Sequence, residues 1–330
     1  MSAKPRRCWA CDDGPLLVSW PARPVTVVVP ATSANLGPGF DSLGLALTLH
    51  DTVEAWVTEA GLEVQVTGVG ADHAWRAADK HLVIQAMRAG FAAAGEDPPG
   101  IAISCRNEVP QGFGLGSSAA AIVAGLLAAR ALAAAHQAAD RPADALPDAE
   151  VFRLACQLEG HPDNVAACLS GGLTVSWSGP AGPRVARLTP APGLAPVLCV
   201  PAIPVATKTA RSALPEQVPH ADAAANSART ALLIAALTGR PDLLLAGTED
   251  FLHQRYRAAV MPGTVMLVAA LRDAGIAAVV SGAGPSVLAL TMDSHDGDAA
   301  EVARIAAQHE EPWRVLPLRV DTLGARLAAD

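Results

Sequence analysis

The sequence predicts a two-domain protein of mixed α and β structure, and three observations lead to that prediction. The chain has 330 residues, more than one hydrophobic core usually accommodates. Apolar residues make up 51% of it and charged residues 17%, which excludes general disorder and indicates a large buried interior. After a Pro- and Gly-rich stretch at 179–196, strand and helix patterns alternate, as they do in a layered α/β domain.

The patterns in the first half of the chain predict strands followed by helices. The β-branched run at 24–30 predicts a buried strand that ends at Pro30, and the patterns at 51–58 and 62–68 predict paired strands. A helix is expected at 79–95 and a strand at 100–110. The long apolar helix after them takes Ser117 or Ser118 as its N-cap. Two more helices are expected at 148–160 and 161–172, the second capped by Asp163.

The second half supplies the alternating pattern. Strands are expected at 195–201 and on both sides of a glycine turn within 277–291, and helices at 222–239 and 264–275. The first two dozen residues have no periodicity and predict a disordered extension. We therefore expect the extension at 1–24, an N-terminal domain at 25–185 and a C-terminal domain at 186–330.

Charge and cysteine content limit the partners and the compartment. The net charge of −8 argues against nucleic acid or an anionic membrane as a partner. Six scattered cysteines without a secretory pattern indicate a reduced, cytoplasmic protein. Cys8 and Cys11 form an isolated CxxC without a second ligand pair, so an exposed tail is favoured over a zinc or redox site. The apolar run at 119–135 is too short to span a bilayer and predicts a core helix.

The sequence VPQGFGLGSSAA at 109–120 is the strongest functional signal, with Gly112, Gly114 and Gly116 at alternate positions before two serines. A Walker A loop is excluded, because no lysine follows the glycines. A Rossmann site is disfavoured, because no acidic residue that could hold a ribose lies between Glu108 and Asp140. Two interpretations remain. The segment is either a loop that binds phosphates through its backbone N–H groups and the N-terminus of the following helix, or simply a tight strand-to-helix turn.

Phosphates of ATP in this loop would require Mg²⁺, which prefers hard oxygen ligands and few protein groups. The loop offers the hydroxyl of Ser117 or Ser118, and the sequence does not decide between them. Glu159, at a helix end before GHPDN, is the candidate carboxylate ligand. Its alternative is a solvated glutamate at a helix terminus.

Four ordered segments together resemble the GHMP superfamily of small-molecule kinases, and within it the homoserine kinase branch. They are VPATSANLGPGFDSLGLAL, PQGFGLGSSAA, EGHPDNVAACLSGGL and SGAGPSVLAL, and PVATKTARSALP and HQRYRAAVMPG agree with the same branch. The resemblance covers roughly residues 25–323. It implies an α+β, two-domain GHMP kinase fold: an N-terminal domain like ribosomal protein S5 domain 2 and a ferredoxin-like C-terminal domain.

The resemblance also implies a reaction, phosphorylation of the L-homoserine side-chain hydroxyl by ATP with Mg²⁺ in threonine biosynthesis, with a homodimer as a further expectation. Rival readings are another GHMP kinase that acts on a different alcohol, such as mevalonate, and a non-catalytic sensor on the same fold. The implied ATP-binding residues form one continuous loop. They are Pro110, Gln111, Gly112, Phe113, Gly114, Leu115, Gly116, Ser117, Ser118, Ala119 and Ala120.

The implied substrate-binding residues suit an amino acid. Asp41 can pair with the ammonium group, while Arg211 and Arg257 suit bidentate contact with the carboxylate. Asn35 and Thr207 are the candidates to orient the hydroxyl. The matching set is completed by His161. Taken singly, each has a structural alternative: a helix cap for Asp41, a core hydrogen bond for His161, or a surface cation for either arginine.

Two positions depart from common patterns of the superfamily. Asn164 stands in the region where many of these kinases have an aspartate base, and an amide cannot accept the proton at neutral pH. We therefore expect catalysis without a general base, by positioning and electrostatic stabilisation. His81 stands where many relatives have asparagine, which leaves the nucleotide contact there open.

Overall fold

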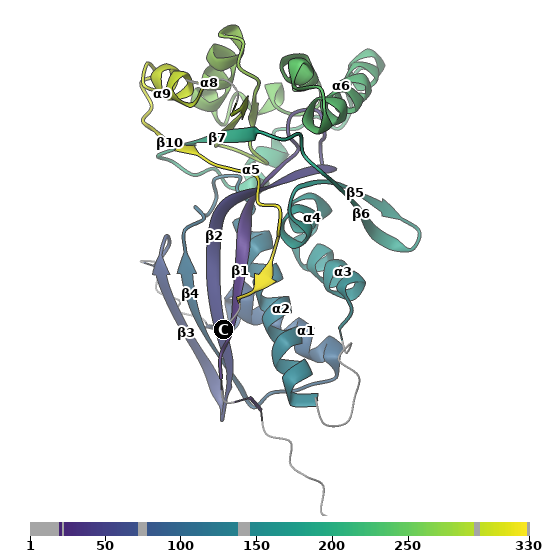
Figure 1. Cartoon of the computed structure of the whole chain (residues 1–330), viewed down its shortest axis with the longest axis vertical. Helices are drawn as coiled ribbons and strands as arrows, with labels where there is room; N and C mark the ends of the chain where they lie inside the picture. Colours follow the sequence, from purple (N-terminus) through teal and green to yellow (C-terminus); the bar gives the residue numbers. More distant parts are fainter. Residues whose placement is uncertain (1–19, 22, 72–77, 138–145, 294–297, 329–330) are drawn as a thin grey trace, which may run out of the picture.

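The structure is a computed structural model that describes residues 20–21, 23–71, 78–137, 146–293 and 298–328. It contains two β-sheets stacked along the long axis, each with helices packed against it (Figure 1). The predictions for Cys8, Cys11 and nearly all of the extension 1–24 lie outside the described residues.

The first sheet has the path β11-β1-β2-β4-β3, with β5 paired to β2 and β6 to β5. All its pairs are antiparallel except β3 with β4, which run parallel. Its strands are β1 (Val25–Ala34), β2 (Leu43–Thr58), β3 (Gly61–Gly68), β4 (Gly100–Asn107), β5 (Leu173–Gly179), β6 (Gly182–Leu188) and β11 (Arg326–Leu327).

Two strand predictions for this sheet were wrong. β1 does not end at Pro30 but continues to Ala34, because the register shifts between Pro30 and Ala31 and the strand resumes pairing beyond the irregularity. The strands at 51–58 and 62–68 are not paired with each other. β4 lies between them and pairs with both, a long-range arrangement that alternation within each segment does not reveal.

One face of this sheet carries four helices, which lie together on its right in Figure 1. The Ala-rich α2 is buried along most of its length between β1 and α1, because small side chains let neighbouring backbones approach closely. The helices are α1 (Leu82–Ala94), α2 (Ser117–Gln137), α3 (Asp148–Glu159) and α4 (Pro162–Ser170), with a short 3-10 turn, η1 (Ala78–Lys80), before α1.

Both predicted caps in this layer were wrong. Helix α2 begins at Ser117, and Gly116 supplies the carbonyl that accepts its first bond, from the Ala120 N–H at 2.9 Å. The cap of α4 is His161, without a side-chain capping bond, and Asp163 lies inside the first turn. Ser118 and Asp163 instead face the groups described below.

By length and composition alone, α2 could cross a membrane, and it is the one such helix in the described part of the chain. The most apolar stretch of α2 is 67% buried within the protein, as in a core helix.

The second sheet has the antiparallel order β10-β7-β9-β8. Numbered by their order along the chain, these strands run 4-1-3-2, and helices connect the first to the second and the third to the fourth. This is the ferredoxin-like arrangement, so that prediction is confirmed. The strands are β7 (Leu194–Pro201), β8 (Ala278–Val280), β9 (Val287–Met292) and β10 (Trp313–Pro317).

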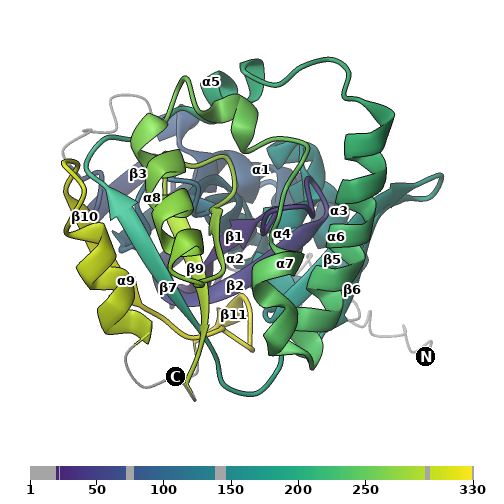
Figure 2. The same ribbon diagram turned by 90° about the horizontal axis from the view of Figure 1, so that it is seen from above.

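Helices α8 and α9 cover one face of this sheet, and in the view from above they lie on the opposite side from α6 and α7 (Figure 2). The other face shares a core with the first layer, in which Leu36, Leu115 and Leu198 are fully or almost fully buried. The helical segments are α5 (Thr207–Ser212), α6 (His220–Thr238), α7 (Leu244–Gly247), α8 (Pro262–Asp273) and α9 (Asp298–Ala306), with 3-10 turns η2 (Pro241–Leu243) and η3 (Arg255–Arg257).

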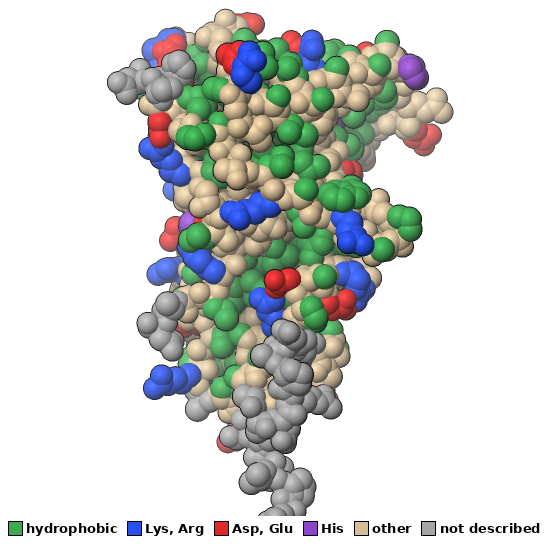
Figure 3. Space-filling model, turned by 45° about the vertical axis from the view of Figure 1, so that its right-hand side comes forward, with side chains coloured by type: hydrophobic (Ala, Val, Ile, Leu, Met, Phe, Trp, Pro, Cys, Tyr) green, Lys and Arg blue, Asp and Glu red, His purple; other side chains and the backbone are tan. Residues whose placement is uncertain are grey.

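The chain passes between the two sheets at residues 189–193, just after β6, and it returns near its end when β11 pairs with β1. On the return, His50 Nε2 lies 2.6 Å from Asp321 Oδ2. The domain limit at 185/186 remains a prediction, because β6 continues in the first sheet to Leu188. On the face shown in Figure 3, acidic and basic side chains are dispersed among apolar ones.

Candidate active site

The glycine loop at 110–116 lies between the two layers, and five successive carbonyl groups within it all accept hydrogen bonds from the protein. Donors come from β1, from the segment before α5, from the turn at 281–286 and from α2 itself. The pairs are Gly112 O with Val205 N (3.1 Å), Phe113 O with Ser286 N (3.3 Å), Gly114 O with Ser281 Oγ (2.7 Å), Leu115 O with Thr32 N (3.0 Å) and Gly116 O with Ala120 N (2.9 Å).

The amide groups of the same loop behave in the opposite way. Within the described residues, the backbone N–H groups of 112–118 donate no hydrogen bond. All three glycines have positive φ, between 66° and 80°, which lets the carbonyl and amide groups point to opposite sides. A row of free N–H groups that continues into the positive end of α2 is a site for an anion with several oxygens, such as a polyphosphate.

Ser118 and Glu159 meet at the start of α2. The Ser118 hydroxyl donates to Glu159 Oε1 at 2.6 Å, across 41 residues of sequence. Burial raises the pKa of the Glu159 carboxyl, opposed by this hydrogen bond. A partly buried carboxylate beside a hydroxyl and next to a phosphate-type loop fits Mg²⁺, which needs few protein ligands when phosphates supply the others. No such contact links Ser117 to Glu159.

Within the described residues, no group of three or more His, Cys, Asp or Glu side chains could hold a metal ion. The candidate magnesium site is therefore of the sparse type, with one hydroxyl and one carboxylate from the protein. A hollow of about 170 Å³ beside it is lined by Ser117 and Ser118 of α2 and by His81 at the start of α1.

His81 is the N-cap of α1, where its Nδ1 accepts from the Val83 N–H at 3.3 Å. Burial lowers the pKa of His81 to about 4, so its ring is neutral at pH 7. Asp51 lines the same hollow and accepts from the N–H groups of Glu108 (2.7 Å) and Val109 (2.8 Å). These two bonds fix the backbone immediately before the glycine loop.

The loop after β1 holds strained backbone at the predicted substrate residues. Asn35, Leu36 and Asp41 all have positive φ, of 68°, 49° and 54°, which is uncommon for residues other than glycine and concentrates at functional sites. The Asn35 amide stabilises this shape: its Oδ1 accepts from Asp41 N at 2.9 Å and its Nδ2 donates to Gly282 O at 2.8 Å. Asn35 therefore links the turn to the second domain.

Asp41 and Arg211 form a bidentate ion pair between the domains. Arg211 Nη2 lies 2.5 Å from Asp41 Oδ1, and Nη1 lies 3.3 Å from Oδ2. Each side chain is about one third exposed, at 34% for Asp41 and 33% for Arg211. His161 belongs to the same group, since burial lowers its pKa, with Arg211 adding to the effect and Asp41 opposing it.

Arg257 lies behind this pair and is 1% exposed. Its Nη1 donates to Gly282 O at 2.9 Å and to His253 Nδ1 at 3.0 Å. Its Nε is buried without a hydrogen-bond partner among the described residues. Burial lowers the pKa of Arg257 to about 10, and the positive charge of the nearby Arg211 acts in the same direction. A buried guanidinium with an unused donor beside a second arginine is suited to a carboxylate ligand.

Phe40 lies under both guanidinium groups, with its ring centre 5.6 Å from the Arg211 Cζ and 6.0 Å from that of Arg257. Thr207 is exposed in the first turn of α5, and the structure records no contact between it and the other predicted residues. Asp41, His161, Arg211 and Arg257 are thus brought together, while Asn35 adjoins them and Thr207 lies outside the group.

Four residues of the site lie in the quoted motifs but were not predicted as site residues from the sequence. Thr32, Ser281 and His253 hold the loop and turns by hydrogen bonds that span more than 80 residues. Asp163 is the fourth, 3% exposed and beside Asn164. Their positions within TSAN, SGAG, HPDN and HQRYR were the only signal, and their partners become visible only in three dimensions.

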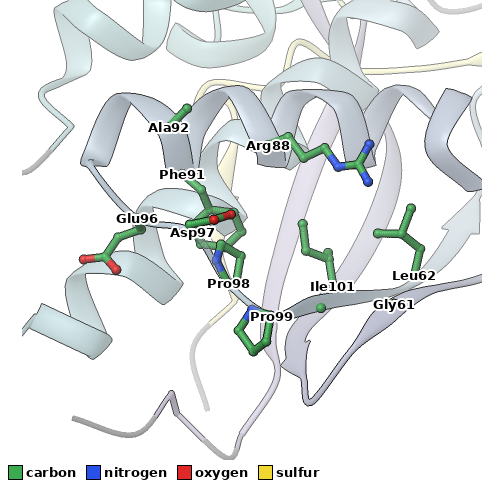
Figure 4. A pocket seen from close by; sticks show the side chains of 11 residues that line it. Gly61, Leu62, Arg88, Phe91, Ala92, Glu96, Asp97, Pro98, Pro99 and Ile101 are labelled. Carbon is green, nitrogen blue, oxygen red and sulfur yellow. The ribbon is translucent and has the colours of Figure 1, made fainter. Parts of the chain in front are cut away.

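A larger hollow of about 560 Å³ lies elsewhere, between α1 and the start of β4 (Figure 4). It is lined by Arg88 and Phe91 of α1 and by Glu96 and Asp97 of the following loop. In Figure 4 the Arg88 and Glu96 side chains point in different directions, so its polar groups do not converge. None of the predicted site residues lines it.

Comparison with known proteins places this geometry in a family. The profile of the GHMP kinases N terminal domain matches residues 81–172, and that of GHMP kinases C terminal matches 232–311. Homoserine kinase of Streptomyces coelicolor is 49% identical over 304 residues, which covers 92% of this chain and 94% of the relative. The chain belongs to the homoserine kinase family of GHMP kinases. Membership of this kinase family makes ATP the co-substrate.

Other members of the family agree. Homoserine kinase of Clavibacter michiganensis is 50% identical over 92% of this chain and 93% of the relative. The crystal structure of homoserine kinase from Cytophaga hutchinsonii superposes with a TM-score of 0.79 at 28% identity, covering 92% of this chain and 97% of that one. The L. major mevalonate kinase, at 16% identity and a TM-score of 0.67 over 92% and 99%, shows the shared fold alone.

Proposed function

We propose that this chain is a homoserine kinase, which transfers the γ-phosphoryl group of ATP to the side-chain hydroxyl of L-homoserine in threonine biosynthesis. Relatives of that name at 47–50% identity over most of the chain support the assignment. The observation that carries it is the Asp41–Arg211 pair with Arg257 behind it, between the domains that enclose the glycine loop. A carboxylate and two guanidinium groups match the ammonium and carboxylate of an amino acid.

In this proposal the loop N–H groups and the start of α2 bind the phosphates of ATP. Ser118 and Glu159 hold Mg²⁺, whose chemistry is to neutralise charge on the phosphate oxygens. Asp41 binds the substrate ammonium, and Arg211 and Arg257 bind its carboxylate. The internal Asp41–Arg211 pair must then separate, so that each partner meets the opposite charge of the ligand instead.

The substrate hydroxyl oxygen forms the new bond to the γ-phosphorus, and the bond from that phosphorus to the oxygen bridging to ADP breaks. The hydroxyl proton passes to the transferred phosphoryl group, because Asn164 offers no carboxylate and its Oδ1 already accepts from Thr32 Oγ1 at 2.8 Å. Catalysis rests on positioning and on fixed N–H and guanidinium groups. Homodimerisation remains a prediction.

A mevalonate-type acceptor is disfavoured because it carries a carboxylate without an ammonium, which would leave Asp41 without a cation. A sensor is disfavoured because a protein that only binds nucleotide does not need the partly buried Ser118–Glu159 pair.

The test is ADP release from ATP and Mg²⁺ with L-homoserine, mevalonate, shikimate, galactose or no acceptor. We expect release with L-homoserine well above the rate without acceptor. Release with mevalonate alone would overturn the assignment, and nucleotide binding without turnover on any acceptor would favour the sensor.

A further inference from the structure

Behind the end of the glycine loop lies a chain of three side chains from two separate parts of the sequence. The Thr32 hydroxyl donates to Asn164 Oδ1 at 2.8 Å. Asn164 in turn donates to Asp163 Oδ1, from its backbone N at 2.7 Å and from Nδ2 at 3.3 Å. Thr32 is fully buried and Asp163 is 3% exposed, so this chain is largely removed from water.

The first member of the chain touches the glycine loop directly. The Thr32 N–H donates to Leu115 O at 3.0 Å. Gly116 leaves no room on that side, since a Cβ there would overlap Thr32 Oγ1 and lie 2.9 Å from Asn164 Oδ1. The loop end is therefore in van der Waals contact with the Thr32–Asn164 hydrogen bond, and a shift of either side chain would move the backbone at 115–116.

The last member lies between the two halves of the site. Asp163 is in the first turn of α4, four residues after Glu159. Burial raises its pKa to about 6, and the charges that reach it come from Asp41, Arg211 and Glu159. The chain thus joins the first turn of α4, which follows Glu159 at the end of α3, to β1, whose Thr32 N–H holds the loop just before α2.

We infer that Thr32, Asn164 and Asp163 are positioning residues that set the end of the phosphate loop, and with it Ser118, against Glu159. This inference rests on the proposed function, because it assumes that the loop binds the phosphates of ATP. The three residues act through the loop backbone and through Glu159. The side-chain amide of Asn164 then has a role that an aspartate could not fill. It accepts from Thr32 and donates to Asp163, whereas an ionised aspartate side chain could only accept.

The test compares Thr32→Val, Thr32→Ser and Thr291→Val with the unchanged protein. Valine removes the hydroxyl donor at nearly constant volume, while serine keeps it. Thr291 is the matched control, a 5% exposed threonine in β9 whose hydroxyl donates to Ala195 O at 2.5 Å, within the second sheet. We expect Thr32→Val to raise the KM for ATP and to lower kcat tenfold or more, since small displacements of reacting groups have effects of about 10²-fold.

The KM for L-homoserine should stay unchanged in Thr32→Val, and Thr32→Ser should recover most of the loss. A purely structural role would lower the melting temperature of Thr32→Val and Thr291→Val alike, without separating the two KM values. If Thr32→Val and Thr291→Val have equal kinetics while the unchanged enzyme is active, the positioning chain is wrong. If the unchanged protein shows no turnover, the proposed function fails instead.

Asn164→Ala provides a second route should Thr32→Val fold poorly. It removes the acceptor of the Thr32 hydroxyl, so the same rise in the KM for ATP is expected. The double variant Thr32→Val/Asn164→Ala should lose little more activity than either single variant, because both changes break one connection. Fully additive losses would show that the two residues act independently.

Discussion

At the scale of single residues, the site depends on charged groups whose environment is set by burial. Glu159 can be a metal ligand because its hydrogen bond with Ser118 holds a partly buried carboxylate at the start of α2. Its raised pKa means that it takes up a proton at higher pH than an exposed glutamate. The type of ligand could be predicted from EGHPDN, and Ser118 could not be separated from Ser117 without the structure.

Glu159→Gln should lose most activity, by roughly two orders of magnitude, the scale at which removal of an electrostatic group affects turnover. Initial rates should be measured over a series of Mg²⁺ concentrations. The control is Glu150→Gln at the other end of α3, where the carboxylate pairs with Arg153 on the surface. Equal Mg²⁺ dependence of the two variants would remove Glu159 from the metal site.

His81 makes the stability of the fold depend on pH, and its buried environment fixes the direction of that dependence. Its pKa in the fold is about 4, below the ordinary value of about 6.5, so the unfolded chain binds the proton between these two values. Stability from the neutral ring is complete above about pH 6.5 and is lost as the pH falls towards 4, by about 1.4 kcal/mol per pH unit.

The comparison variant is His81→Asn, because asparagine also caps helices and does not titrate. Urea unfolding of both proteins from pH 7.5 to 4 should show the free energy of unfolding of the unchanged protein falling more steeply below pH 6.5. Parallel curves for the two proteins would contradict a buried neutral His81.

At the scale of elements, the glycine loop shows how far sequence patterns reach. Gly112, Gly114 and Gly116 predicted a loop with free N–H groups, and their positive φ values agree with it. The sequence could not show that the Ser281 hydroxyl and the backbone amides of Thr32, Val205 and Ser286 hold the carbonyl groups. Serine and aspartate are usual cap residues, but here their side chains make other hydrogen bonds: Ser118 binds Glu159 across 41 residues, and Asp163 accepts from the neighbouring Asn164.

Gly114→Ala tests the close approach of the loop to the second domain. A Cβ there would overlap Ser281 O and lie 2.8 Å from Gly284 N. Gly95→Ala is the matched control, since Gly95 has the same φ of 74° and open space around it. The backbone cost of about 1–2 kcal/mol is common to both variants. Chemical denaturation and ATP titration should show Gly114→Ala less stable and weaker in ATP binding, and equal losses would contradict the contact.

At the scale of the whole molecule, the site exists because two domains share one core. Leu115 of the loop lies in that core with Leu198 of β7, so the phosphate loop is fixed by both layers at once. The alternation of strands and helices predicted a layered α/β second domain, and the resemblance to GHMP kinases implied its ferredoxin-like order. The pairing of β3 with β4, and the return of β11 to β1, depend on contacts between distant segments, and local periodicity carries no information about them.

In the proposed function, the pairing of Asp41 with Arg211 across the domains, 170 residues apart in sequence, is the whole-molecule feature that selects the substrate. A zwitterion satisfies both partners when the pair opens, whereas an acceptor with one charge leaves the other partner, which is only partly exposed, without an opposite charge. Selection by charge therefore predicts a preference between acceptors that share a carboxylate and a hydroxyl and differ in the ammonium.

The most direct measurement is ³¹P NMR of one reaction that contains ATP, Mg²⁺ and equal concentrations of L-homoserine and mevalonate. We predict that the phosphorus lost from the γ-position of ATP appears as a single phosphomonoester, coupled to the methylene protons of O-phospho-L-homoserine. A phosphomonoester of mevalonate, or release of inorganic phosphate alone, would contradict the assignment of this chain as a homoserine kinase.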